Sequence, residues 1–122
     1  MREPMRDPGR LEDILDASML IVDSTSNITY EQFLRERLKY FGIIKNVEII
    51  GEAAYMLTPG FRSAHPEVPW DEMIKMRHVL VHGYASILPE ILWDTCRNDI
   101  PSIIPPIQAL LDSFNRLEDC KI

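Results

Sequence analysis

The chain has 122 residues, 46% of them hydrophobic and 26% charged, a balance typical of one globular domain spanning residues 1–122. Its formal net charge of -6 disfavours DNA as a partner and a broad nucleic-acid-binding surface, because such surfaces rely on clustered Lys and Arg. No apolar run reaches the roughly 18 residues of a membrane span, and no signal-type stretch precedes Leu11, so we expect a cytoplasmic protein.

Two cysteines, Cys96 and Cys120, lie far apart and have no C-x-x-C spacing. Two such thiols fit a reducing compartment better than a disulfide scaffold or a zinc site. The sequence therefore predicts a fold held by its apolar core.

The first half of the chain has the apolar periodicity of two helices. One stripe covers residues 8–24, with Asp7 as its expected N-cap and a proline in its first turn. Thr29 and Gln32 then have the T-x-x-Q spacing of a capping box. The stripe that follows predicts one long second helix that runs to about Thr58, where a Pro-Gly pair stops it.

The middle of the chain predicts a third helix preceded by a polar connector. Residues 61–68 have the composition of a loop, and Pro69 stands where a helix tolerates proline, at its start. Gly83 is the expected end of this helix. Late in the second helix, Gly51 belongs to a small-residue patch that predicts close packing against another helix.

The last third predicts a short helix over residues 89–98 and a final helix, separated by residues 99–102. Pro105 and Pro106 fit best if Ser102 is near the cap of the final helix, where few backbone donors have intrahelical partners. No segment alternates apolar and polar residues long enough to predict a sheet. We therefore expect an all-α, up-and-down bundle of four main helices and one shorter element.

One charged residue interrupts the apolar face of the third helix. Arg77 lies among apolar residues at the i, i+3, i+4, i+7 spacing of a buried helix face. Burying an unpaired guanidinium costs several kcal/mol, so Arg77 requires a partner or a groove. A carboxylate such as Glu52 or Asp94 could be that partner. Any RNA contact would be concentrated near Arg77, with Arg62, Lys75 and Arg97 as candidate neighbours.

His82 follows Arg77 by five residues, about 140° around an ideal helix, so the two cannot share one regular face. They could act together if Gly83 frees the last turn, or if two chains meet around a two-fold axis. A histidine and an arginine suffice for metal-free, cofactor-free RNA cleavage by the 2′-hydroxyl, since one moves a proton and the other grips the phosphate. The competing interpretation is that Arg77 forms a structural ion pair and His82 stabilises the helix C-terminus.

A metal site is not predicted at these residues. His78 and His82 are four residues apart and could bind a metal weakly, but no H-E-x-x-H motif and no third ligand is evident.

The run from Arg77 through His82 to Tyr84 resembles the R-x4-H-x-Y signature of HEPN-domain toxins of the HepT type. The resemblance covers most of the chain. Further segments match the family in its order: Gly51–Ala54, His65-Pro66, Pro69-Trp70, Trp93 and the Asp99–Pro101 start of the last helix.

This resemblance implies a helical HEPN bundle that forms a homodimer, with one RNA-cleaving cleft composed from both copies of the motif. Arg77 and His82 would be the ribonuclease pair, and His78 would occupy a supporting polar position. Tyr84 would be AMPylated by a minimal nucleotidyltransferase (MNT) antitoxin, which would make the chain the toxin of a type VII HepT/MNT toxin-antitoxin system. The alternative, from another functional class, is a non-catalytic helical partner or regulatory subunit of such a nucleotidyltransferase.

Overall fold

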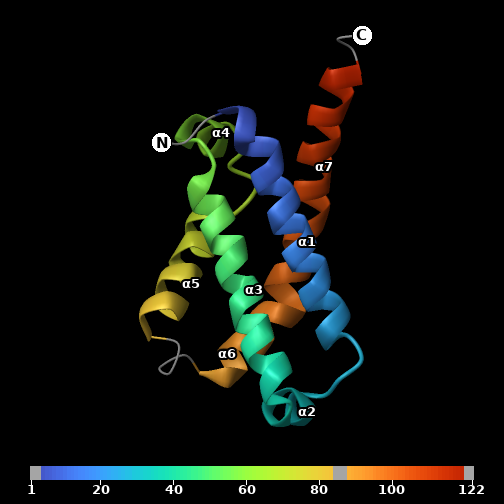
Figure 1. Cartoon of the computed structure of the whole chain (residues 1–122), viewed down its shortest axis with the longest axis vertical. Coiled ribbons are helices and arrows are strands. Elements are labelled where there is room, and N and C mark those ends of the chain that lie inside the picture. The colour runs from blue at the N-terminus through green and yellow to red at the C-terminus, as the bar shows by residue number, and fades with distance from the viewer. Residues whose placement is uncertain (1–3, 84–87, 120–122) are drawn as a thin grey trace.

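The computed structural model describes residues 4–83 and 88–119, and every regular element in these ranges is helical. A 3₁₀ turn at Pro4–Arg6 leads into the helices α1 (Asp7–Thr25), α2 (Tyr30–Arg35), α3 (Arg37–Met56), α4 (Pro59–Ala64), α5 (Trp70–Gly83), α6 (Pro89–Asp94) and α7 (Ile100–Asp119). The four long helices alternate in direction along the chain (Figure 1). The expected all-α, up-and-down bundle is therefore confirmed.

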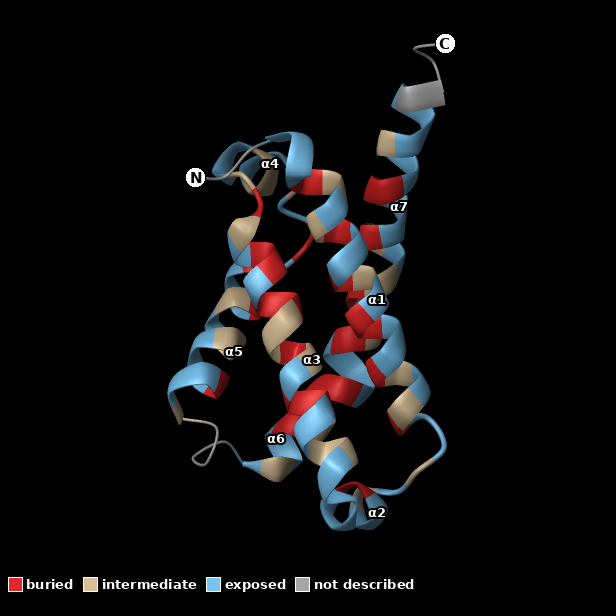
Figure 2. Cartoon of the chain, viewed as in Figure 1, coloured by how far each residue is buried: buried red, intermediate tan, exposed pale blue. Residues whose placement is uncertain are grey.

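The core lies between α5, α3, α1 and α7, which pack in this order from one side of the bundle to the other (Figure 1). Buried positions face inward on each long helix, and exposed positions face outward (Figure 2). The buried apolar side chains include Leu11, Ile14, Ile21, Val47, Ile50, Ala54, Trp70, Met73, Leu80, Ile103, Ile107 and Leu111. Within the described ranges, no helix combines the length and apolarity needed to cross a membrane.

The start of α1 differs from its prediction in one respect. Asp7 is the first residue of the helix rather than its N-cap. Its buried carboxylate accepts hydrogen bonds from the Thr58 backbone amide, at 3.0 Å, and from the Thr58 hydroxyl, at 2.8 Å. The charge therefore joins the start of α1 to the α3–α4 junction instead of capping its own helix.

The expected single helix over residues 30–58 is wrong, because the chain breaks at Glu36 (φ -85°, ψ 80°). The predicted capping box is confirmed: Gln32 N donates to the Thr29 hydroxyl, and Thr29 N donates to the Gln32 side chain. Before the break, α2 lies at one end of the bundle near α6 (Figure 1). There Phe33 is buried, with its ring 5.0 Å from those of Tyr40 and Trp93. Packing against a distant residue thus overrides a sequence of good helix formers.

The connector expected over residues 61–68 is also partly helical. α3 ends at Met56, close to its predicted end, and Thr58 then caps the short helix α4 with Pro59 in its first turn. α5 begins at Trp70, directly after Pro69, as predicted, and it is helical as far as Gly83, where the described range ends.

The predicted separator at residues 99–102 is not a loop. A π-helical turn at Thr95–Asp99 joins α6 to α7 without interruption, and the Ile100 amide donates to the Thr95 carbonyl. The wider turn keeps Cys96 and Ile100 buried on one core-facing side. Ser102 is consequently inside α7, where its hydroxyl donates to the Asp99 carbonyl at 2.6 Å. The two prolines lie within α7 rather than in its first turn, and packing of the apolar face offsets their missing donors.

Candidate functional site

The backbone of α5 lies directly against α3 at one residue. A Cβ built on Gly51 would overlap the Cβ of Arg77 and lie 2.6 Å from the Met73 carbonyl oxygen. Any side chain at this position would push the two helices apart. The prediction that Gly51 serves close helix packing is therefore confirmed, and the residue it accommodates is Arg77 itself.

Arg77 has a carboxylate partner, as expected for a guanidinium on an apolar helix face. Its Nε lies 2.5 Å from Oε2 of Glu52, the residue after Gly51. The guanidinium also lies over the ring of Tyr55, 5.8 Å from its centroid. The Arg77 side chain remains 29% exposed and that of Glu52 49%. Consecutive turns of α3 thus hold Arg77 at the surface, and Glu52 is its ion-pair partner among the described residues.

Arg77 lines a surface hollow of about 340 Å³ formed by α1, α3 and α5. The residues that line it are Arg10, Asp13, Lys45, Glu48, Ile49, Glu52, Ala53, Arg77 and Val81. Three of them are cations and three are carboxylates, so the hollow carries no net formal charge. Arg10 contributes an Nε that is buried without a hydrogen-bond partner among the described residues, whereas Lys45 pairs with Glu48 at 3.8 Å.

The cations around Arg77 are not the ones expected from the sequence. Arg97 donates to the Thr25 carbonyl at 2.8 Å and lies over Trp93, and Arg62 lines a different hollow beside α4. Lys75 is exposed on α5 and does not line the hollow. The position of Lys45 near Glu52 is predictable from helical spacing, since Lys45 lies two turns before Glu52 on the same helix. The position of Arg10 in the hollow is not predictable in this way, because Arg10 belongs to a different helix, α1.

His78 and His82 are exposed on α5, with ring centroids 4.5 Å apart. His82 occupies the last turn, and neither histidine lines the Arg77 hollow. α5 remains regularly helical through Gly83, so the possibility that this glycine frees the preceding turn is not realised. One chain therefore does not bring Arg77 and His82 together on one face. Tyr84 lies outside the described residues.

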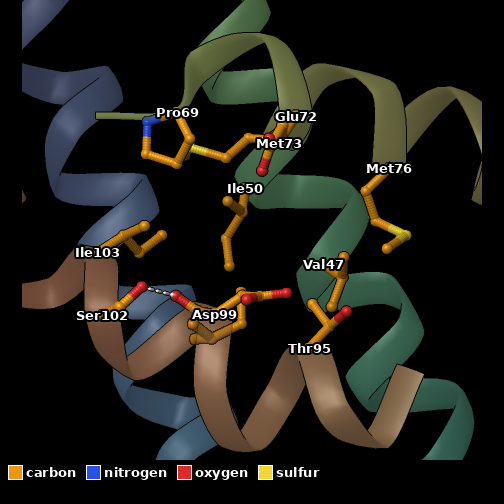
Figure 3. A pocket seen from close by; sticks show the side chains of 11 residues that line it. Val47, Ile50, Pro69, Glu72, Met73, Met76, Thr95, Asp99, Ser102 and Ile103 are labelled. Carbon is orange, nitrogen blue, oxygen red and sulfur yellow. Dashed lines mark hydrogen bonds between the residues drawn. The ribbon is translucent and has the colours of Figure 1, made fainter. Parts of the chain in front are cut away.

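A second hollow, of about 300 Å³, lies between α3, α5 and the π-helical turn (Figure 3). Apolar side chains such as Ile50 and Met73 line it, together with the carboxylates of Glu72 and Asp99. Burial raises the pKa of the Asp99 carboxyl group, Asp94 and Glu72 raise it further, and a hydrogen bond from Thr95 opposes the shift. An anionic phosphate is disfavoured beside these carboxylates, so this hollow is a poorer candidate for a phosphate site than the Arg77 hollow.

Thiol chemistry is not supported at Cys96. The residue is fully buried, and its burial raises the pKa of the thiol to about 12. Since the thiolate is the nucleophilic form, Cys96 serves as a core residue.

Comparison with known proteins matches residues 14–110 to the family described as Ribonuclease HepT-like. A protein of Thermococcus cleftensis named "Probable ribonuclease HepT" is 43% identical over 93 residues, which cover 76% of this chain and 84% of that protein. A protein of Methanocaldococcus jannaschii named as a "Putative RNase" is 36% identical over 93 residues, 76% of this chain and 85% of its own length. A second such protein from that organism is 36% identical over 101 residues, covering 83% and 84%.

No solved structure matches the chain. The matched region extends from α1 into α7 and includes both Glu52 and the Arg77–His82 segment. The chain therefore belongs to the HepT-like ribonuclease family.

Proposed function

We propose that the chain is a metal-independent endoribonuclease and the toxin of a HepT/MNT toxin-antitoxin system. Arg77 binds the scissile phosphate, His82 transfers a proton, and His78 supports them as a polar neighbour. The observation that carries the proposal is the way Arg77 is held: its Nε pairs with Glu52, its side chain stays 29% exposed, and it lines a surface hollow. A guanidinium oriented in this way can bind two phosphate oxygens at once.

The proposed reaction needs only groups of the RNA and the protein. The 2′-oxygen attacks the adjacent phosphorus, the bond from phosphorus to the 5′-oxygen breaks, and a 2′,3′-cyclic phosphate and a 5′-hydroxyl result. His82 acts as general base toward the 2′-hydroxyl proton or as general acid toward the departing 5′-oxygen. Arg77 stabilises the negative charge that develops on the phosphoryl oxygens.

The separation of Arg77 and His82 around α5 supports a cleft shared by two copies of the chain. A two-fold axis near the end of α5 would place Arg77 of one copy opposite His82 of the other.

Cleavage of total cellular RNA in the presence of EDTA tests the proposed reaction. We expect the purified wild type to cleave and the Arg77→Ala, His82→Ala double variant to be inactive, since both the phosphate contact and the proton transfer are removed. Equal cleavage by both proteins would place the activity outside this motif. If AMP-free wild type cleaved no RNA, the assignment would pass to the alternative, a non-catalytic partner of the nucleotidyltransferase.

Glu52 is expected to act as a positioning residue for Arg77. Glu52→Ala should lower kcat/KM about 10- to 100-fold, because a displaced guanidinium no longer meets the phosphate in the transition state. Glu52→Gln should retain most of the activity, since its amide oxygen can still accept from Nε. Glu48→Ala is the matched control, because it removes a carboxylate from the same hollow without a contact to Arg77. Equal losses for Glu48→Ala and Glu52→Ala would contradict the positioning role.

Tyr84 is proposed as the acceptor of AMP from the cognate MNT antitoxin. AMP would add an anionic phosphate and bulk next to a cleft that receives a polyanion, so the modified chain should not bind RNA productively. Intact-mass spectrometry after co-expression with the transferase should show added AMP on the wild type and none on Tyr84→Phe. An unchanged AMP mass on Tyr84→Phe would exclude this tyrosine as the acceptor.

A further inference from the structure

The exposed face of α5 carries two histidines, His78 and His82. They take no part in the Arg77–Glu52 ion pair and are not packed in the core. The His78 and His82 rings lie 4.5 Å apart with an interplanar angle of 52°, and both residues are exposed. Neither imidazole has a hydrogen-bond or ion-pair partner among the described residues. The chain's third histidine differs: Nδ1 of His65 lies 3.2 Å from the Glu67 carboxylate, and its ring contacts Phe61.

We propose that His78 and His82 form a chelating site for a divalent transition-metal ion such as Zn²⁺ or Ni²⁺, and that the bound ion blocks RNA cleavage. The first part of this proposal, metal binding (the binding half), depends only on the geometry of α5. The inhibitory half rests on the proposed function, because it needs His82 as the proton-transfer group.

The spacing of the two rings fits one shared ion. Residues four apart on a helix project from the same face, one turn above the other. Two imidazoles that each point a nitrogen at one ion, at about 2.1 Å, have ring centroids about 4.5 to 5 Å apart. The observed separation of 4.5 Å falls in this range. Metal binding therefore requires only rotation of two exposed side chains and no movement of the backbone.

The donor set defines the class of ion. Imidazole nitrogens suit Zn²⁺, Ni²⁺ and Cu²⁺, whereas Mg²⁺ and Ca²⁺ prefer oxygen ligands. Two protein ligands leave the remaining coordination positions to water, and among the described residues there is no group of three or more metal-binding side chains. The site should therefore bind the ion reversibly, as expected of an inhibitory site, rather than retain it as a structural one.

Metal binding and proton transfer compete for the same lone pair of the imidazole nitrogen. An imidazole coordinated to a metal uses the lone pair that would otherwise accept a proton. If His82 is the general acid or base, an ion held between His78 and His82 stops the reaction even when RNA remains bound at Arg77.

Nickel titration followed by proton NMR tests the binding half, because the chain has only three histidines. The sample is the tag-free full chain with Cys120→Ser at pH 7.5, where most free imidazoles are neutral. Substoichiometric Ni²⁺ should broaden the ring signals of His78 and His82 and leave those of His65 sharp. Calorimetric titration with Zn²⁺ should show affinity more than about tenfold weaker in His78→Ala and unchanged in the control His65→Ala. Equal broadening of all three histidines, or unchanged affinity in His78→Ala, would overturn the site.

The inhibitory half is tested separately by RNA cleavage at saturating Zn²⁺. We expect loss of wild-type cleavage that EDTA restores, and a much weaker effect of Zn²⁺ on His78→Ala relative to its own metal-free rate. Zinc binding without inhibition would overturn this half alone. If the wild type cleaved no RNA even in EDTA, the proposed function would fail, while the NMR and calorimetric results would still decide the metal site.

Discussion

A mixture of Arg77→Ala and His82→Ala chains should regain RNA cleavage that neither variant has alone. In each homodimer, both Arg77–His82 pairs of the shared cleft lack one essential group. In a mixed dimer, the intact Arg77 of one chain would face the intact His82 of the other in one of the two pairs. With random pairing, half of the dimers are mixed, so we expect about a quarter of the wild-type rate.

The experiment follows from the regular helical geometry of α5, which separates Arg77 from His82 within one chain. Both variants are purified separately, shown by circular dichroism to be folded, unfolded together in urea and refolded as a mixture. The matched control is refolding of each variant alone. Persistent inactivity of the mixture, with mixed dimers demonstrated by native mass spectrometry, would show that the two copies do not share the reaction.

Replacement of Gly51 by alanine should destabilise the fold and misplace Arg77. The added Cβ meets the Cβ of Arg77 and the Met73 carbonyl oxygen, and these are backbone-bound atoms that cannot rotate away. Overpacking of this kind costs about 1–3 kcal/mol of unfolding free energy, occasionally more. Because α5 must shift to relieve it, kcat/KM for RNA should fall in the fraction that remains folded.

Gly42→Ala is the matched control for this prediction. Gly42 lies in the same helix, α3, and a Cβ built on it meets nothing within 4 Å. The substitution should stabilise the protein by about 0.5–1 kcal/mol, because alanine loses less backbone freedom than glycine in a helix interior. Urea unfolding measures both variants. Equal stability of the two alanine variants would contradict the close approach at Gly51.

The sequence predicts the structure correctly where the determining interactions are local. The capping box of Thr29 and Gln32 sets a helix start through two contacts within one turn, and α5 begins directly after Pro69, at the predicted residue. The predicted helix boundaries are wrong where residues distant in the sequence decide them. Nothing near Glu36 signals the break between α2 and α3, because the packing of Phe33 against Trp93 joins segments that lie far apart in the sequence. Likewise, only a π-helical turn allows the apolar face at Cys96 to continue into α7.

The same division applies to the candidate site. The sequence alone determined the all-α class, the third helix and the Arg77–His82 spacing, because helical periodicity and end signals are local properties of the chain. It also named Glu52 among the possible partners of Arg77. Only the tertiary structure decided that Glu52 is the partner, that Gly51 receives the α5 backbone, and that Arg10 and Lys45 line the Arg77 hollow. These features depend on how closely α1, α3 and α5 pack, and packing distance is a property of the assembled core.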